Sequence, residues 1–249
     1  MSVDIGQAIE EGGKRTVARN GLYLVAISWV LGILNQLFGN TVAQGFMSQI
    51  PSGAAPTGQF GQPTVGPSLG LSAGVAWVLS LLVGALGIVV VLGAYRTFVT
   101  EDTESLPPER FTRNLGWAWV NLFIGWIIFW IVVGIGFVFL LIPGFFLLVS
   151  LLFWGVYVAV EDQNFVEGFQ NSWGLTGGNR IMLFATGVVV VIVAIIVSWV
   201  FGIPRMAGLG GWIGLLVGQI GSALSLVFVL ATIARTFLQL TEDEAAAAE

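Results

Sequence analysis

The sequence contains no cysteine and no histidine, and these two absences exclude several kinds of chemistry. A serine or cysteine nucleophile activated by histidine cannot form. A zinc site built from cysteine and histidine, a haem ligated by either residue and a disulfide are excluded as well. We therefore predict no catalytic residue of these types, no metal site and no cofactor.

Charged residues are also scarce, at 9% of the chain, whereas a soluble domain carries about 25%. Hydrophobic residues make up 56% of the sequence. A globule of this composition could not cover its surface with groups that water solvates, so we predict an integral membrane protein. The net charge is −5 and the bases form no stripe, which argues against a nucleic-acid partner.

Six segments are apolar enough to cross a bilayer, for which a helix needs roughly 20 residues. No Asp, Glu, Lys or Arg lies in their cores. The third and fourth form one apolar stretch, which Pro143 and Gly144 are expected to divide, because proline interrupts a helix and glycine permits a turn. The predicted spans are residues 21–39, 71–97, 115–141, 144–160, 181–203 and 211–236.

The predicted fold is all-α, a polytopic membrane protein whose six transmembrane helices form three hairpins with short cytoplasmic amphipathic lead-in helices. Each third of the chain has a polar lead-in, a basic start, a two-span hairpin and an acidic end, which indicates an internal repeat. The repeats lie at about 1–102, 103–162 and 163–243. We assign residues 1–243 to one six-helix membrane domain and 244–249 to an acidic, alanine-rich tail.

The basic residues predict the orientation, because lysine and arginine concentrate in cytoplasmic loops. With six spans, only Arg205 falls on the side opposite the other bases, so we expect a cell-membrane protein with both termini in the cytoplasm. Residues 40–70 are uncharged and rich in proline, which is typical of an external loop, either a solvated connector or a binding loop. A signal peptide over 1–43 is disfavoured, because Thr41-Val42-Ala43 is a poor cleavage site.

Arginines near the span starts and acidic pairs just past the span ends predict a belt of ion pairs at the cytoplasmic rim. The alternative is that the arginines follow the charge rule and the acids stay hydrated, since exposed pairs contribute only about 0–1 kcal/mol. The predicted rim residues are Arg19, Arg96, Arg113, Arg180, Arg235, Glu101, Asp102, Glu161, Asp162, Glu242 and Asp243.

The lead-in at 163–179 has an aromatic residue at every fourth position. Phe165, Phe169 and Trp173 alternate with polar residues, which predicts an amphipathic helix lying in the membrane interface. A docking helix for a partner protein is the alternative, because such apolar faces also fill grooves.

Two further patterns within the spans predict helix contacts. The last span carries small residues at fourfold spacing, which let another backbone approach closely, in this chain or in a second subunit. Strongly polar side chains in the spans are expected to hydrogen-bond neighbouring helices rather than a substrate. The small residues are Gly210, Gly214, Gly218 and Ser222, and the polar ones are Asn35, Gln36, Asn121 and Gln219.

One stretch of the sequence is similar to a known family. It contains Phe139-Leu140-Leu141-Ile142-Pro143-Gly144, Val158-Ala159-Val160-Glu161-Asp162, Gly168-Phe169, Ser172-Trp173, Leu175-Thr176 and Gly178-Asn179-Arg180. Over about 139–185 it resembles the membrane domain attached to some glycerophosphoryl diester phosphodiesterases, and related six-span families of unknown function. The resemblance implies a six-helix membrane domain. It transfers no catalytic residue, because the chemistry of those enzymes resides in a separate soluble barrel.

The sequence thus favours a non-enzymatic structural or scaffold protein that contacts membrane lipid and a membrane-protein partner or a second copy. A transporter or channel for a neutral or amphipathic solute is the first alternative, and it would need a wet cavity lined by the polar span residues. An enzyme acting on lipid headgroups is the second, and it would need the rim acids to surround a pocket.

Overall fold

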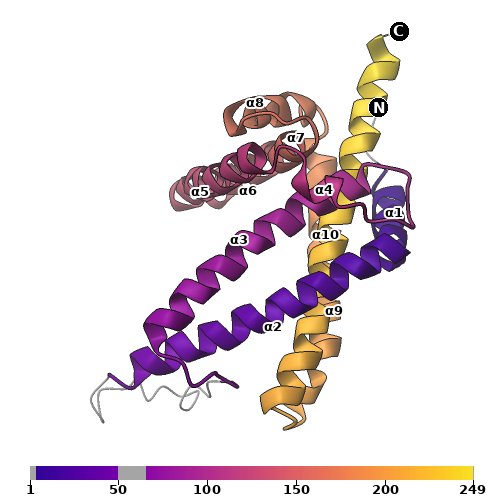
Figure 1. Cartoon of the computed structure of the whole chain (residues 1–249). Coiled ribbons are helices and arrows are strands. Elements are labelled where there is room, and N and C mark those ends of the chain that lie inside the picture. Colours follow the sequence, from indigo (N-terminus) through magenta and orange to yellow (C-terminus); the bar gives the residue numbers. More distant parts are fainter. Residues whose placement is uncertain (1–3, 50–65, 249) are drawn as a thin grey trace. The chain divides into compact units, whose positions relative to one another are not determined.

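The computed structural model describes residues 4–49 and 66–248, and these form ten helices and no strand. Six helical segments are long and apolar enough to cross a membrane, which confirms the predicted all-α fold with six candidate spans. Figure 1 shows the helices in chain order. The candidate spans are α2 (Arg19–Met47), α3 (Ala73–Phe98), α5 (Leu115–Phe139), α6 with α7 (Leu141–Val160), α9 (Arg180–Met206) and residues Gly211–Glu242 of α10.

A short helix precedes each pair of spans: α1 (Ile5–Val17), α4 (Glu109–Thr112) and α8 (Phe165–Leu175). The Asp4 side chain begins α1 by accepting a 2.9 Å hydrogen bond from the Gln7 amide. Asn164 begins α8 as part of a capping box, in which its side chain and that of Glu167 bond reciprocally to backbone amides. Polar N-cap side chains satisfy amides that lack a partner in the first helical turn, so these lead-ins have local reasons to form.

The turn between the third and fourth spans lies earlier than the sequence predicted. Leu140 is extended, with φ −166° and ψ 152°, and α6 (Leu141–Ser150) begins directly after it. Pro143 therefore lies in the first turn of α6, where its missing N–H costs nothing. A Cβ on Gly136 would lie 3.0 Å from the Cα of Gly144, so the close approach of α5 and α6 requires glycine at this point. A turn after Ser150 then separates α6 from α7 (Trp154–Val160).

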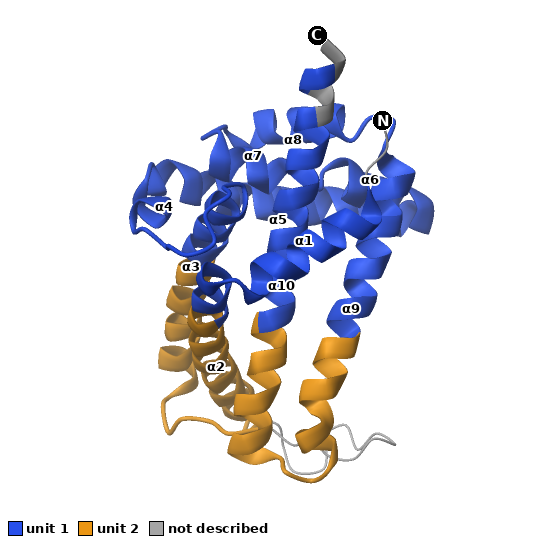
Figure 2. Ribbon diagram, turned by 90° about the vertical axis from the view of Figure 1, so that its right-hand side faces the viewer, with its two compact units in different colours: residues 1–25, 88–195, 224–249 blue, residues 26–87, 196–223 orange. Residues whose placement is uncertain are grey.

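The chain divides into two compact units, coloured in Figure 2. Unit 1 comprises residues 1–25, 88–195 and 224–249, and unit 2 comprises 26–87 and 196–223. The units do not follow the three predicted repeats, because unit 2 combines parts of the first and the third. α10 (Gly211–Ala248) continues through most of the predicted acidic, alanine-rich tail.

The core of unit 1 centres on α7, in which every residue from Trp154 to Ala159 is buried. The Phe237 ring of α10 packs against Phe153 and Tyr157, with ring centroids 5.9 and 5.0 Å away. The last part of the second hairpin is therefore packed against α10, which comes from the end of the chain.

The core of unit 2 lies between α2 and α3, where Phe38, Ala76 and Val83 are buried together. The Trp29 indole donates a 2.9 Å hydrogen bond to the Leu216 carbonyl, which ties α2 to α10. A Cβ on Gly221 would lie 2.7 Å from the Cβ of Phe201, so α9 and α10 approach closely at this glycine.

Candidate functional site

One arginine cluster of unit 1 joins the first and last helices through Glu101. Arg235 of α10 donates from Nε to Glu11 of α1 at 2.6 Å and from Nη1 to Glu101 at 2.7 Å. Arg15 of α1 donates to the other Glu101 oxygen at 2.6 Å. Both arginine side chains are largely buried, at 13% and 8% exposed. The four side chains, which we name the Arg235 cluster, thus connect segments far apart in the sequence.

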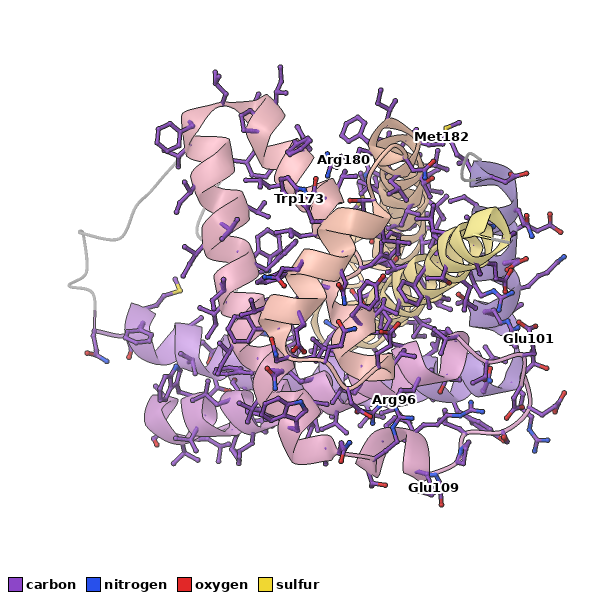
Figure 3. The ribbon with its side chains drawn as sticks, turned by 90° about the horizontal axis from the view of Figure 1, so that it is seen from above. Arg96, Glu101, Glu109, Trp173, Arg180 and Met182 are labelled. Carbon is purple, nitrogen blue, oxygen red and sulfur yellow. The ribbon has the colours of Figure 1, made fainter. Side chains whose placement is uncertain are left out.

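A second cluster centres on Arg96 of α3, whose side chain is only 5% exposed. Its guanidinium donates to the Ala159 carbonyl at 2.6 Å, the Arg113 carbonyl at 2.8 Å and the Arg110 carbonyl at 3.1 Å. Ala159 lies in the last turn of α7, where carbonyls have no partner within the helix. Arg96 therefore caps the C-terminus of α7 and also holds the segment around α4. Figure 3 shows Arg96 beside that segment.

Asp162 adds the ion pairs of the Arg96 cluster. Its carboxylate lies 3.3 Å from Arg96 and 3.4 Å from Arg113, and Arg113 also donates to the Val160 carbonyl at 2.7 Å. Asp162 has a left-handed φ of 54°, which aspartate tolerates better than most residues. The acidic end of the second hairpin is therefore part of the structure that the arginines hold.

The segment after α3 is fixed mainly through Asp102. Asn20 donates to the Asp102 carbonyl at 2.7 Å, and Arg110 donates to its carboxylate at 2.9 Å. The Ser105 hydroxyl and the Ser105 and Glu104 amides also donate to this carboxylate, and these bonds hold its pKa well below the usual range. Asp102 thus remains a carboxylate that orders the 101–105 segment.

The pKa values of the other rim acids shift according to their partners. Burial raises the pKa of Glu11, but hydrogen bonds from Arg235 and Gln7 and the charge of Arg235 outweigh it, so the net pKa is lowered. The Arg235 hydrogen bond is the main reason that the pKa of Glu101 is lowered. Desolvation raises the pKa of Glu161, and a hydrogen bond from Gln163 only partly opposes it.

Several predicted rim residues need correcting. Arg180 forms no ion pair with any residue the structure describes; its guanidinium lies 4.8 Å from the Trp173 ring centroid and 4.6 Å from that of Phe146. Glu161 accepts from Gln163, and no arginine among the described residues reaches it. Glu242 is exposed with no ion pair to a described residue, and the side chain of Asp243 lies outside the described part. Arg19, in contrast, forms an ion pair, with its Nη1 atom 3.6 Å from the carboxylate of Glu104.

Four residues of this network lie outside the predicted set of rim residues: Arg15, Arg110, Glu11 and Glu104. They lie in the lead-ins rather than at the span ends. The fourfold spacing that places Arg15 on the same face of α1 as Glu11 is a signal for these two residues, whereas no such spacing marks Arg110 or Glu104.

The aromatic residues of α8 occupy a different face from its buried one. Gly168, Ser172 and Leu175 are buried, and Ser172 donates to the Ser150 carbonyl at 3.0 Å. Phe165 and Phe169 are half-buried, and the Phe169 ring packs 5.2 Å from that of Trp154. Trp173 is 43% exposed, and Figure 3 shows it beside Arg180.

Three of the four small residues of the last span, Gly214, Gly218 and Ser222, line a cavity of unit 2. A Cβ on Gly210 or Gly218 would meet nothing within 4 Å, whereas one on Gly214 would lie 3.1 Å from the Leu209 carbonyl oxygen and 3.4 Å from the Cβ of Arg205. Ser222 is exposed and bonds to its own helix. Within the described chain, only Gly214 of these residues lies against a neighbouring helix, at Arg205 of α9, and a closer approach of α9 and α10 occurs at Gly221. The contact with a second subunit stays a prediction.

The polar span residues divide between the two units. In unit 1, Asn121 accepts from the Phe165 amide at 3.1 Å and joins α5 to α8. In unit 2, Gln36 and Gln219 line the cavity, which has a volume of about 280 Å³. Asn35 is exposed and does not line it. Residues 50–65 of the predicted external loop lie outside the described part, and residues 40–47 continue α2.

Comparison with known proteins gives one match. No curated protein and no solved structure matches the chain. The resemblance to phosphodiesterase membrane domains gains no support from these comparisons and stays a prediction. A family described as a domain of unknown function, DUF7847, matches residues 3–240, so the chain belongs to the DUF7847 family.

Proposed function

We propose that this protein is a non-enzymatic membrane scaffold whose cytoplasmic end presents a fixed surface to a membrane-protein partner. The observation that carries this proposal is the Arg235 cluster, in which α1, the 101–105 segment and α10 meet at two buried guanidinium groups. Ordering these segments in advance reduces the entropy that a partner must offset on binding.

The geometry offers less support for an enzyme at the cytoplasmic surface. A general acid or base needs a carboxyl group that can exchange its proton. Glu101 and Asp102 have lowered pKa values and bind arginines, and Asp162 lies between Arg96 and Arg113. Glu101 and Asp162 thus belong to two separate clusters and Asp102 pairs with Arg110, which favours a structural role for these acids.

The orientation belongs to the same proposal: both termini lie in the cytoplasm of a cell-membrane protein. The chain has no cysteine, so single cysteines report sidedness directly. We expect a membrane-impermeant maleimide to label Ser48→Cys on intact cells and Gln7→Cys only after lysis. Labelling of Gln7→Cys on intact cells would contradict the orientation.

Native mass spectrometry of the full chain in mild detergent tests the scaffold role. We expect a second membrane protein to copurify with this chain in fixed stoichiometry. Arg235→Gln should release that partner, because α1 is no longer held against α10. Arg19→Gln is the matched control, since its side chain is 65% exposed and its ion pair is long. A chain that elutes alone, or a partner that both variants retain equally, would overturn the proposal.

A further inference from the structure

The cavity of unit 2 has the chemistry of an anion site. It lies between α2, α9 and α10, where small residues leave space that side chains would otherwise fill. We propose that this cavity, the Arg205 cavity, binds a phosphate group, either free or in the headgroup of a lipid. Its polar lining consists of Gln36, Asn40, Ser198, Arg205, Gln219 and Ser222.

The charge of the cavity comes from Arg205 alone. The sequence places no aspartate, glutamate or lysine and no other arginine in residues 26–87 or 196–223, so Arg205 is the only ionised side chain of unit 2. The arginines of unit 1 bind carboxylates, carbonyls or aromatic rings, whereas unit 2 contains no carboxylate for this one. A guanidinium presents N–H donors in a planar fork that matches two oxygens of a phosphate.

Part of the polar lining is held in place. The Gln36 amide donates to Asn40 at 2.9 Å, and the Asn40 amide donates to the Pro67 carbonyl at 2.8 Å. The Gln219 amide oxygen occupies space that a Cβ on residue 32 would need, so its position requires Gly32. The two hydrogen bonds hold Gln36 and Asn40 on the α2 side of the cavity.

Other donors of the cavity remain available to a ligand. Arg205 and Ser198 are exposed and Gln219 is half-buried, and none of the three side chains forms a hydrogen bond with a described residue, although each carries N–H or O–H donors. A phosphate has only acceptor oxygens when fully ionised, so it complements this set better than a cation would. A volume of about 280 Å³ suits a small group rather than a whole drug-sized ligand.

The surroundings of the cavity favour a lipid as the source of the phosphate. Trp199 and Trp212 flank it in sequence and are 70% and 53% exposed. Tryptophan is enriched at the level of the lipid headgroups. Arg205 is also the one base predicted on the non-cytoplasmic side, so the phosphate would come from the outer leaflet or from that aqueous side. Because the cavity belongs to unit 2, its ligand binding does not depend on the proposed role of the clusters in unit 1.

A single cysteine in the cavity reports its occupancy. We would make Ser198→Cys in the full chain, purify it in a neutral detergent and measure the rate at which a maleimide labels it. The added compounds are inorganic phosphate, dihexanoyl-phosphatidylglycerol and a diacylglycerol of the same chain length without phosphate. We expect the phospholipid to slow labelling and the diacylglycerol to have no effect. Slowing by inorganic phosphate as well would identify the free anion as a ligand too.

Two variants in the Ser198→Cys background test the role of the charge. Arg205→Gln should weaken the apparent affinity by at least about tenfold, which corresponds to about 1.4 kcal/mol. Arg19→Gln, which removes an exposed arginine of unit 1, should leave it unchanged. Gln219→Leu provides a second test through a different donor if Arg205→Gln does not fold. Protection by neither phosphate compound, equal protection by diacylglycerol, or protection that survives both cavity variants would overturn the proposal.

Discussion

Arg235 donates a 2.7 Å hydrogen bond to Glu101, which lies 134 positions earlier in the chain. Glu101 follows the first hairpin and Arg235 lies near the end of the last candidate span. The same guanidinium binds Glu11 of α1, so one side chain connects three segments that separate in the unfolded chain. Contacts of this kind hold a helix such as α1, which is too short to be stable alone in water.

We expect Arg235→Gln to lower the free energy of unfolding by about 1–3 kcal/mol, because two charge-assisted hydrogen bonds are lost. The effect is limited because Glu101 is 80% exposed and can be hydrated in the variant. Unfolding by heat in detergent, followed by circular dichroism, measures it. Arg19→Gln should change stability by less than about 1 kcal/mol. Equal effects of the two substitutions would show that the Arg235 cluster is not stabilising.

We expect Arg96→Lys to destabilise the protein by about 2–3 kcal/mol although it keeps the charge. A lysine cannot donate to the Ala159, Arg113 and Arg110 carbonyls in the geometry of the guanidinium fork. Asp162→Asn should cost less than about 1 kcal/mol, because its ion pairs are long and partly exposed. A larger loss for Asp162→Asn than for Arg96→Lys would mean that the ion pair, not the carbonyl contacts, stabilises this end of unit 1.

Two adjacent glycines of α1 should respond in opposite directions to alanine. A Cβ on Gly12 would overlap Thr232 of α10, whose Cα would lie only 3.1 Å away, so Gly12→Ala should cost about 1–3 kcal/mol. A Cβ on Gly13 would meet nothing within 4 Å, so Gly13→Ala should stabilise α1 by about 0.5–1 kcal/mol. Thermal unfolding and limited proteolysis of α1 measure both. Destabilisation by Gly13→Ala would contradict the packing of α1.

Hydropathy was sufficient to predict the six candidate spans, because they lie in continuous apolar runs, of which one is long enough for two crossings. Hydropathy was not sufficient to place the turn between the third and fourth spans. Pro143 and Gly144 suggested a break at their own position, whereas the break occurs at Leu140. Proline is tolerated in a first helical turn, so the same residue fits a turn or a helix start. The residues next to Pro143 in the sequence do not distinguish a turn from a helix start.

The ion pairs show the same limit. The sequence predicts that arginines and acids gather at the span ends, but it does not identify the partners, since Arg96 and Asp162 are 66 positions apart. The small residues of α10 are a further example. Fourfold spacing predicts a helix face made of small residues. Whether such a residue packs against another helix depends on where the neighbouring helices lie: Gly221 contacts Phe201, whereas Gly218 lines a cavity.

The Arg235 cluster should make the protein sensitive to acid. Glu11 and Glu101 have pKa values lowered below the ordinary 4.5, so their ionised forms stabilise the folded state. This contribution is complete above pH 4.5 and is lost as the pH falls through the lowered values. We expect the melting temperature to fall below pH 4.5, and to fall less steeply in Glu101→Gln, which has one such group fewer.

Glu161→Gln is the control for this pH dependence. The pKa of Glu161 is raised, so its ionised form is the less favourable one in the folded protein, and any stability that it contributes is lost as the pH rises. Its replacement should therefore leave the loss of stability below pH 4.5 intact and raise the melting temperature slightly at neutral pH. If Glu161→Gln weakened the acid response as much as Glu101→Gln, the response would have to arise outside the Arg235 cluster.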